Sequence, residues 1–593
     1  MHRRAALLWL AVVLAGCSLR GGAPGTPDQP AARVAVDPTE STPAPAAASA
    51  LPVAGGVVAS AHPLATAAGA AMLRKGGTAF DAAVATALAL GVVNAHSSGI
   101  GGGGFAVYQQ GDMPPASLDF REEAPSFFAP DTFLAEGRNS RRGPWATGIP
   151  GEVAGLGELH ARGGTLPWAD VVEPARVLAA DGFEVMPYLG RALKGVGDDI
   201  LADPGLAADF APNGTVLTTG ERCVRPALAR TLEYVQHHGP RGFYEGPLAT
   251  SMAGFLAAQG LPWTADELAG YEPKTRAPLR ATYRGYGVHV MGPPSSGGIA
   301  LIQTLGILER TNHHEQEYGS AEWTRTLAQA LSHAFADRAT YGGDPDFVEV
   351  PIADLTAPAT LDALTAALPR RGPVGLYEAG LSGLRGDSKA VVPDDGGTSH
   401  LAVIDGAGNA VALTTTINLW FGSGQADPQT GVVFNDEMDD FSARPGEPNA
   451  FGLMQSERNA PGAGRRPLSS MSPTLVTDPD GRVILAVGAA GGPRIITSTL
   501  QVILAVVDRG ADAESALASK RIHHQWLPPT VWVEEGFPAP GRAMLEAEGF
   551  AVDALTRYAV AQAAVFDPAT GALSGGGDPR ADGDAVVVPA ASP

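Results

Sequence analysis

Two strand-like runs joined by a short polar turn constrain the fold of this chain more than any other feature. The runs 396–405 and 410–418 are rich in β-branched residues, and the turn between them contains Gly, Ala and Asn, which is typical of a β-hairpin. With the turn centred on Ala407, apolar residues oppose each other on one face, and Thr398 opposes Thr416 on the other. A slip of one residue would mix the two faces, so the pattern predicts this register.

The rest of the chain predicts blocks of helices and strands, which favours an α+β arrangement in layers. A strand is expected at 56–60, and helical patterns follow at 63–73 and 78–93 with a Gly-Gly pair between them. The segment 160–390 is mostly helical in pattern. Further strands are expected at 105–108, 400–421 and 482–488, a strand and turn at 286–294, and one long helix at 494–509, with Pro493 suited to its first position.

Composition and charge exclude several functional classes. The 593 residues carry a formal net charge of −21, and their basic residues are scattered, which argues against nucleic acid as a partner. Two cysteines exclude a disulfide scaffold. A G-x-G-x-x-G stretch at 99–104 follows a helical pattern instead of a strand, and no Walker A, HExxH or CxxC motif occurs. We therefore predict neither an organic cofactor nor a metal.

The N-terminus predicts an export signal followed by a tether. A pair of arginines precedes a short apolar run that ends in Leu-Ala-Gly-Cys at Cys17, so residues 1–16 are interpreted as a signal peptide. The last four residues resemble a bacterial lipobox, which implies a lipid on Cys17; an ordinary cleaved signal with a chance cysteine is the alternative. Residues 17–52 are too poor in bulky apolar side chains to fold. We expect an exported protein of the periplasm, attached to a membrane, preferably the outer one, only through this lipid.

Several motifs resemble those of the γ-glutamyltranspeptidase family. They are LDFREEAP at 118–125, PPSSGGI at 293–299, DGGTSHLAVID and GNAVALTTTIN in the hairpin, and then FNDEMDDFS, RPLSSMSPT and GAAGGPRIIT. The resemblance extends from about residue 53 to about residue 584. It implies the αββα four-layer sandwich of the N-terminal-nucleophile hydrolases, made as one chain that cuts itself into two subunits that stay together.

The resemblance implies a cut between Gly397 and Thr398, giving a large subunit of 53–397 and a small subunit of 398–593. The Thr398 hydroxyl would attack the Gly397 carbonyl, and water would then release a new N-terminus. A free α-amine has a pKa of about 7.7–8.0, so it can accept the hydroxyl proton near neutral pH. Glutathione or another γ-glutamyl compound would then acylate Thr398, and water, an amino acid or a peptide amine would receive the glutamyl group.

The resemblance also assigns the groups that assist Thr398. Thr416 would hydrogen-bond Thr398. The backbone amides of Gly491 and Gly492 would stabilise the oxyanion, since they lie between a predicted strand and a helix N-terminus, where negative charge is favoured.

The glutamyl head of the substrate is a zwitterion and needs groups of both signs. Arg121 would bind its α-carboxylate through a bidentate guanidinium; an ion pair of Arg121 with Glu122 or Glu123 is the alternative. The other expected substrate-binding residues are Ser469 and Ser470, which add donors, and Glu437, Asp440 and Asn418, which take the α-ammonium. Asp436 and Asp439 are interpreted as solvated charges. Residues 443–454 match a lid loop, with Phe451 where relatives often have Tyr.

Two alternatives to a γ-glutamyl hydrolase and transferase remain. One is an acylase of the same superfamily that removes glutaryl-type side chains from β-lactams. Because a glutaryl group lacks the ammonium, Arg121 together with Asp440 and Glu437 favours an α-amino acid head. The other is a catalytically silent binding lipoprotein of the envelope, against which the intact Thr398 and Thr416 count.

Overall fold

The computed structural model describes residues 55–375, 396–444, 446–556 and 559–590. All of them belong to one structural unit, 51–593. The predicted signal peptide, the lipidation site Cys17 and the tether all lie outside the described residues. No described helix combines the length and the apolar character needed to cross a membrane.

Two antiparallel sheets form the centre of the unit. The first has the strand order β18-β1-β9-β10-β2-β3-β6 and the second β17-β16-β12-β11-β8-β7. The first sheet comprises β1 Gly56–Ser60, β2 Gly103–Gln109, β3 Ala116–Phe120, β6 Lys274–Arg276, β9 Gly396–Asp405, β10 Ala410–Leu419 and β18 Asp584–Val588. The second comprises β7 Leu279–Tyr283, β8 Tyr286–Val290, β11 Thr474–Thr477, β12 Val483–Ala490, β16 Val560–Asp567 and β17 Ala572–Gly577. Smaller pairings involve β4 Phe183–Glu184, β5 Arg222–Cys223, β13 Ile522–His523, β14 Thr530–Glu534 and β15 Ala551–Leu555.

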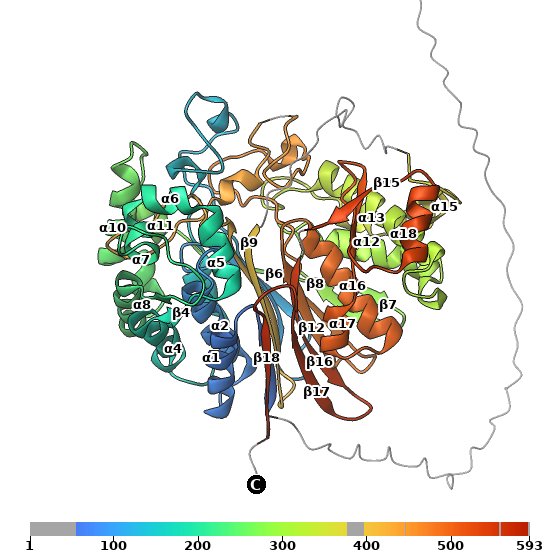
Figure 1. Ribbon diagram of the computed structural model, residues 1–593, viewed down its shortest axis with the longest axis horizontal. Helices are drawn as coiled ribbons and strands as arrows, with labels where there is room; N and C mark the ends of the chain where they lie inside the picture. The colour runs from blue at the N-terminus through green and yellow to red at the C-terminus, as the bar shows by residue number, and fades with distance from the viewer. Residues whose placement is uncertain (1–54, 376–395, 445, 557–558, 591–593) are drawn as a thin grey trace, which may run out of the picture. The chain divides into compact units, whose positions relative to one another are not determined.

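Helices cover the outer face of each sheet, and the two inner faces pack against each other (Figure 1). The first sheet is covered by α1 Pro63–Arg74, α2 Ala79–Val93, α3 Glu152–Gly163, α4 Trp168–Asp181, α5 Pro187–Gly195, α6 Gly197–Ala202, α7 Pro204–Phe210, α8 Pro226–His238, α9 Arg241–Tyr244, α10 Gly246–Ala257 and α11 Ala265–Ala269. The second is covered by α12 Gly297–Arg310, α13 Ala321–Tyr341, α14 Ile352–Leu355, α15 Pro358–Ala366, α16 Arg494–Arg509, α17 Ala513–Ala518 and α18 Ala539–Ala547. The predicted αββα sandwich is confirmed.

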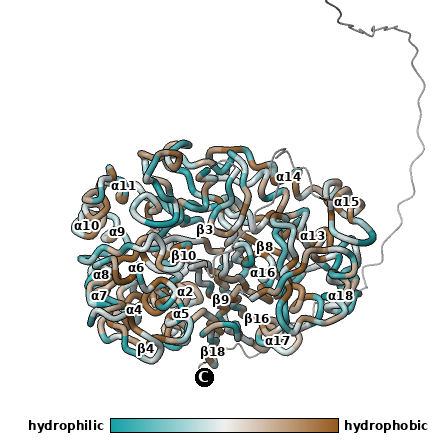
Figure 2. Tube along the Cα trace, turned by 45° about the horizontal axis from the view of Figure 1, so that its top comes forward, coloured by the Kyte–Doolittle hydropathy of each residue, from teal (hydrophilic) through white to brown (hydrophobic). Residues whose placement is uncertain are grey.

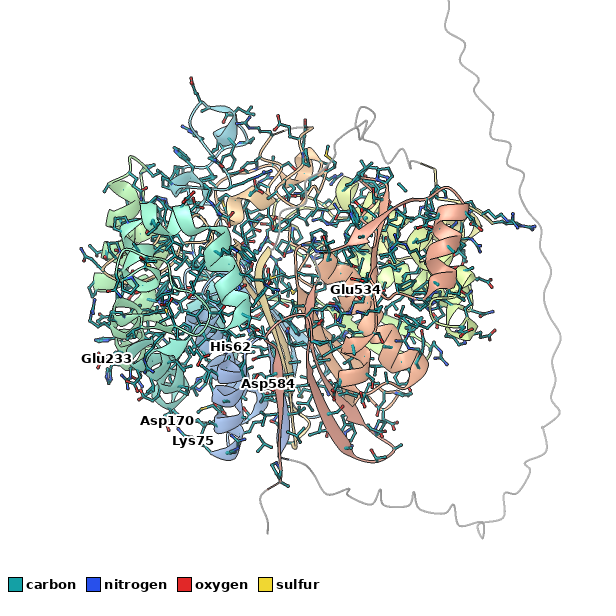
Figure 3. The ribbon with its side chains drawn as sticks, viewed as in Figure 1. His62, Lys75, Asp170, Glu233, Glu534 and Asp584 are labelled. Carbon is teal, nitrogen blue, oxygen red and sulfur yellow. The ribbon has the colours of Figure 1, made fainter. Side chains whose placement is uncertain are left out.

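The elements inside the layers are hydrophobic, whereas the outer surface is more hydrophilic. Helix α2 is buried at every residue, because it lies between the first sheet and the outer helices α3 and α4. In Figure 2 the hydrophobic segments lie mainly within the layers, whereas the outer loops are more hydrophilic. Exposed charged residues such as Lys75, Asp170 and Glu233 lie on the outer side of the first helical layer (Figure 3).

The predicted hairpin is confirmed, including its register. Thr398 pairs with Thr416 and Leu401 with Leu413, and a β-bulge interrupts the pairing just after Thr416. Both faces are buried, since the hairpin is central in its sheet: Leu401 belongs to the core beneath the helices, and Ala402 belongs to the core shared with the second sheet. The face that carries Thr398 is therefore the one that meets the second sheet.

The remaining predicted elements are close to the observed ones. Helices α1, α2 and α16 lie within one residue of the expected bounds at each end. Thr78 caps α2 reciprocally with Asp81, as its sequence pattern favours. Helix α16 begins where it was predicted to, but Pro493 occupies its N-cap instead of its first helical position.

Candidate active site

Thr398 and Thr416 form a hydroxyl pair at the buried start of the hairpin. Their Oγ atoms are 3.0 Å apart. The Thr416 hydroxyl donates to the carbonyl oxygen of Gly397 at 2.7 Å and accepts from the Asn418 amide at 2.9 Å. Because Thr416 has one proton and gives it to Gly397, Thr398 must be the donor in the hydroxyl pair. The result is a relay from the Thr398 hydroxyl through Thr416 to the carbonyl of the expected cleavage site.

The β-bulge after Thr416 creates this relay. Asn418 has a φ of 75°, a conformation that Asn tolerates better than most residues. This turns its backbone N–H back toward Thr416 Oγ, while its side-chain amide donates to the Asp436 carbonyl at 3.0 Å. The side chain of Asn418 thus ties the hairpin to the segment that carries Glu437 and Asp440.

Gly491 and Gly492 lie between the end of β12 and the N-terminus of α16. Their φ values are 124° and 60°, which favour glycine. A Cβ on Gly492 would lie 2.6 Å from the Phe451 ring. Neither amide donates a backbone hydrogen bond within the described part of the chain. Two N–H groups at a helix N-terminus with no acceptor are suited to an oxyanion.

Packing between the sheets brings these glycines toward the hairpin. Gly488 of β12 lies against His400 of β9, so closely that a Cβ on Gly488 would be 2.4 Å from the imidazole. His400 lies on the same strand face as Thr398, and its own hydrogen bond goes to Thr414 at 2.9 Å. Burial lowers the pKa of His400 to about 3, so the imidazole is neutral at neutral pH. Its hydrogen bond stays within the hairpin.

Arg121, Glu437 and Asp440 form one buried ionic cluster. Arg121 follows β3 and is only 1% exposed. Its Nη2 donates to Asp440 Oδ2 at 2.6 Å, and its Nη1 donates to Glu437 Oε1. Glu122 lies 3.7 Å from Nη1. Arg121 therefore pairs with Glu122, one of its alternative partners, but its shorter contacts are with the two acids expected to hold the substrate ammonium. The other alternative, Glu123, pairs with Arg466 at 3.5 Å.

Three carboxyl groups share this one guanidinium. Their burial disfavours the charged form and therefore raises their pKa values. Burial raises the pKa of Glu437 well above its usual range, although Arg121 opposes the shift. Burial likewise raises the pKa of Glu122 to about 8 and raises that of Asp440. For Arg121, burial alone would lower the pKa, but Glu437, Asp440 and Glu122 raise it overall. Burial thus favours the protonated form of these carboxyl groups, and Arg121 opposes that effect.

Ser469 and Ser470 lie in the loop before β11, braced by the 293–299 turn. The Ser469 amide donates to the Pro294 carbonyl at 2.8 Å, and Ser469 Oγ accepts from the Met471 amide at 3.1 Å. Ser470 Oγ accepts from Arg338 Nη2 at 3.4 Å. Each hydroxyl accepts from a donor, which leaves its proton available for a ligand.

Asp436 and Asp439 are buried, so their interpretation as solvated charges is wrong. Asp436 Oδ1 accepts from the Leu419 amide at 2.9 Å. Asp439 accepts from Ser140 at 2.6 Å and lies 3.3 Å from Arg141. These contacts join distant segments, which the sequence pattern alone does not reveal.

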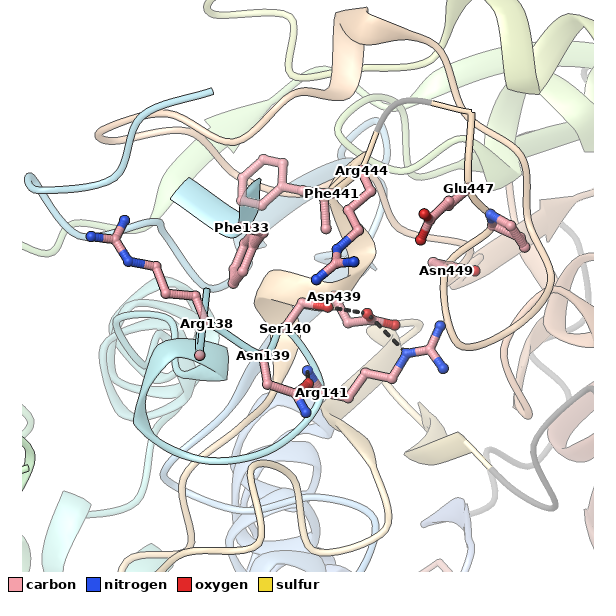
Figure 4. Close-up of a pocket in the computed structure, with 13 residues that line it drawn as sticks. Phe133, Arg138, Asn139, Ser140, Arg141, Asp439, Phe441, Arg444, Glu447 and Asn449 are labelled. Atoms are coloured by element: carbon pink, nitrogen blue, oxygen red, sulfur yellow. Dashed lines mark hydrogen bonds and ion pairs between the residues drawn. The ribbon is translucent and has the colours of Figure 1, made fainter. Parts of the chain in front are cut away.

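A pocket of about 520 Å³ lies beside the ionic cluster, between residues 133–141 and a second wall that is formed by Asp439, Phe441 and the first part of the lid loop (Figure 4). Asn449 lines it and donates to Asp440 Oδ1 at 3.1 Å. Asp439, drawn with its bonds to Ser140 and Arg141, forms another part of the wall. The lid aromatic Phe451 is buried against Gly492.

Sequence reasoning missed Asn449 and Arg338. Asn449 lies in the lid but has no motif that distinguishes it from other loop asparagines. Arg338 was unremarkable as one charged residue in a helical pattern. Its burial depends on how α13 packs, and only that packing makes it notable.

A buried carboxyl behind the hairpin should make stability depend on pH. Glu152, at the start of α3, accepts from the Thr415 hydroxyl at 2.7 Å, and burial raises its pKa to about 8. The folded state keeps this proton from the unfolded pKa of about 4.5 up to about 8, whereas the unfolded state has lost it. Between these values stability falls as pH rises, by about 1.4 kcal/mol per pH unit for one proton.

Replacing Glu152 by Gln should therefore flatten part of the loss of stability between pH 5 and pH 8, measured by denaturant unfolding. Gln keeps an acceptor for Thr415 but cannot ionise. The control is Glu158→Gln, because Glu158 lies on the same helix with a side chain that is 42% exposed. Equal pH profiles for the Glu152→Gln variant and the native chain would contradict the expectation.

Comparison with known proteins places this geometry in a family. The family described as Gamma-glutamyltranspeptidase matches residues 65–588. The glutathione hydrolase proenzyme of Escherichia coli (strain K12) is 39% identical over 535 residues, which cover 89% of this chain and 91% of that protein. The glutathione hydrolase proenzyme of Pseudomonas sp. (strain A14) is 40% identical over 81% of this chain and 83% of its own length.

Solved structures share the fold. A cephalosporin acylase from Bacillus halodurans superposes with a TM-score of 0.78 at 27% identity, covering 93% of this chain and 99% of that one. A γ-glutamyltranspeptidase from Helicobacter pylori superposes with a TM-score of 0.53 at 32% identity, covering 58% of this chain and 100% of that one.

Proposed function

Because the chain belongs to the γ-glutamyltranspeptidase family, we propose that it is a glutathione hydrolase and γ-glutamyltransferase that is activated by cutting itself at Gly397–Thr398. The observation that carries the proposal is the relay from Thr398 through Thr416 to the Gly397 carbonyl. The hydroxyl expected to attack and the carbonyl expected to be attacked share one hydrogen-bonded partner before any substrate binds.

The relay supplies the groups that self-cleavage requires. The Thr416 hydroxyl polarises the Gly397 carbonyl and accepts the hydrogen bond of Thr398. Attack by Thr398 Oγ forms a C–O bond to the Gly397 carbonyl carbon, the amide C–N bond breaks, and the Thr398 nitrogen takes the proton that the hydroxyl loses, which leaves an ester and a free amine. Water then hydrolyses the ester. The products are a chain that ends at Gly397 and a chain that begins with Thr398, which remain associated because β9 is central in a sheet shared by both.

The freed amine of Thr398 acts as the base in turnover. It removes the hydroxyl proton as Oγ attacks the γ-carbonyl of the substrate, while the amides of Gly491 and Gly492 stabilise the oxyanion. The C–N bond breaks, the leaving amine takes the proton, and a γ-glutamyl ester of Thr398 remains. Water gives glutamate, whereas an amino acid or peptide amine gives a new γ-glutamyl amide; either releases Thr398 unchanged.

The ionic cluster favours an α-amino acid head over a glutaryl group. Arg121 and the hydroxyls of Ser469 and Ser470 suit a carboxylate, and Glu437 and Asp440 suit an ammonium. The curated relatives, named glutathione hydrolases, support the same choice, although a cephalosporin acylase shares the fold. With a γ-glutamyl anilide and a glutaryl anilide compared under the same conditions, we expect higher kcat/KM on the first. Faster turnover of the glutaryl compound would support the acylase, and an uncut inactive chain would support a silent binding protein.

We also propose that the enzyme is exported and anchored in the cell envelope by a lipid on Cys17, with the outer membrane as its site. The basic, apolar and Leu-Ala-Gly-Cys segments of residues 1–17 support this. The intact mass of the mature large subunit tests it: a chain that begins at Cys17 with added acyl mass is expected, and an unmodified N-terminus would refute the anchor.

A further inference from the structure

Arg338 presents a buried positive charge that forms no ion pair with any carboxylate in the described part of the chain. It lies on α13, which covers the second sheet, and is 3% exposed. Its Nε and Nη1 have no hydrogen-bond partner among the described residues, and its Nη2 donates to Ser470 Oγ at 3.4 Å. Burial lowers the pKa of Arg338 to about 10, so it remains charged at neutral pH. Burying an unpaired cation destabilises the folded state, so we expect Arg338 to have a functional role.

The neighbourhood of Arg338 is the end of the site where the substrate head belongs. Asp440 is the charged group that acts on Arg338 electrostatically, and it is also the ion-pair partner of Arg121 at 2.6 Å. Arg121 is already occupied by Glu437 and Asp440. A substrate carboxylate arriving beside Arg121 therefore meets two acids as well as one guanidinium, and it needs a second source of positive potential.

The contact with Ser470 decides how Arg338 can supply that potential. Because a guanidinium can only donate, Ser470 Oγ is the acceptor, and the hydroxyl proton of Ser470 must point to another partner. Ser470 keeps an exposed fraction of 8%, whereas Nε and Nη1 of Arg338 are fully enclosed. Arg338 therefore acts through Ser470 instead of touching the substrate itself.

We propose that Arg338 is a positioning residue for the α-carboxylate of the substrate: it turns the Ser470 hydroxyl toward that carboxylate and places a second positive charge behind it. This inference rests on the proposed function. It accounts for a buried guanidinium without an ion pair, and for a site that accepts a carboxylate although acids outnumber Arg121.

The test uses two substrates, L-γ-glutamyl-4-nitroanilide and its analogue in which the α-carboxylate is an α-carboxamide. Arg338→Gln should raise KM for the first by about tenfold or more while kcat changes by less than about threefold, which is the signature of lost binding shared by ground and transition states. With the carboxamide as substrate, the KM values of the variant and the native enzyme should differ by less than about threefold. Arg338→Lys, which keeps the charge, should recover part of the loss.

Ser470→Ala completes a double-mutant cycle. In the Ser470→Ala background, which lacks the hydroxyl, Arg338→Gln should raise KM by less than about half of the rise that it causes in the native enzyme. Arg325→Gln is the matched control, since Arg325 lies on the same helix and pairs with Glu548 at 2.6 Å; it should leave both KM values unchanged.

Three results would overturn the inference: equal losses on both substrates, a loss confined to kcat, or additive effects in the cycle. Inactive native enzyme on the anilide would instead refute the proposed function. If Arg338→Gln does not fold, as absence of the two subunits would show, the cycle is measured with Arg338→Lys. A KM rise restricted to the carboxylate substrate is still expected, because the ammonium cannot reproduce the guanidinium bond to Ser470.

Discussion

Replacing Thr398 by Ala is expected to leave the protein as one uncut chain without γ-glutamyl turnover. The variant lacks the oxygen that attacks the Gly397 carbonyl, and without the cut no N-terminal amine forms to act as a base. Turnover should fall by several orders of magnitude, as when a catalytic nucleophile is removed. A denaturing gel and an anilide assay measure both consequences on the same sample.

The matched control is Thr398→Ser, which keeps the hydroxyl and loses only a methyl group. It should still cut itself and retain measurable turnover. Thr398 pairs with Thr416 in a buried sheet, so the alanine variant should remain folded, with the circular dichroism of the native chain. Efficient cleavage of the alanine variant, or a small subunit that begins at another residue, would refute the assignment of the nucleophile.

Replacing Arg121 by Ala is expected to weaken transition-state binding by about 2–5 kcal/mol, the usual cost of truncating one member of a buried charge pair. The substrate loses its carboxylate partner, and Glu437 and Asp440 lose the cation that pairs with them at present. Because 1.36 kcal/mol corresponds to about a tenfold change, kcat/KM for the γ-glutamyl anilide should decrease by more than tenfold. The kcat/KM of Arg121→Lys should lie between those of the native enzyme and Arg121→Ala, since lysine keeps the charge but cannot bind a carboxylate in the bidentate manner of a guanidinium.

The control for Arg121 is another buried arginine outside the site. Arg225 is 1% exposed and pairs with Asp209 at 3.0 Å. Arg225→Ala should lower the free energy of unfolding, as Arg121→Ala also should, but it should leave KM of the folded enzyme unchanged. An Arg121→Ala enzyme with native kcat/KM would show that Arg121 does not contact the substrate.

Local pattern was sufficient to predict the hairpin and the helices that flank it. Leu401 and Leu413 alternate with Thr398 and Thr416 at the two-residue period of a strand, so the register follows from neighbouring residues alone. Helix α2 has a cap at Thr78 and a long apolar run, which also act locally. The αββα layering and the roles of the site residues came from resemblance to a family, because no local rule reports how two sheets stack.

The linear chain was enough to single out the expected nucleophile, its expected hydroxyl partner and the acids and arginine expected to bind the substrate, because those residues lie in short contiguous motifs that resemble those of the family. Only the folded chain showed that Arg121 pairs with Glu437 and Asp440, that Asp436 and Asp439 are buried, and that Arg338 lies behind Ser470. The physical reason is that burial and charge pairing depend on segments hundreds of residues apart. They arise when the layers pack, and the desolvation that results sets the charges of the site.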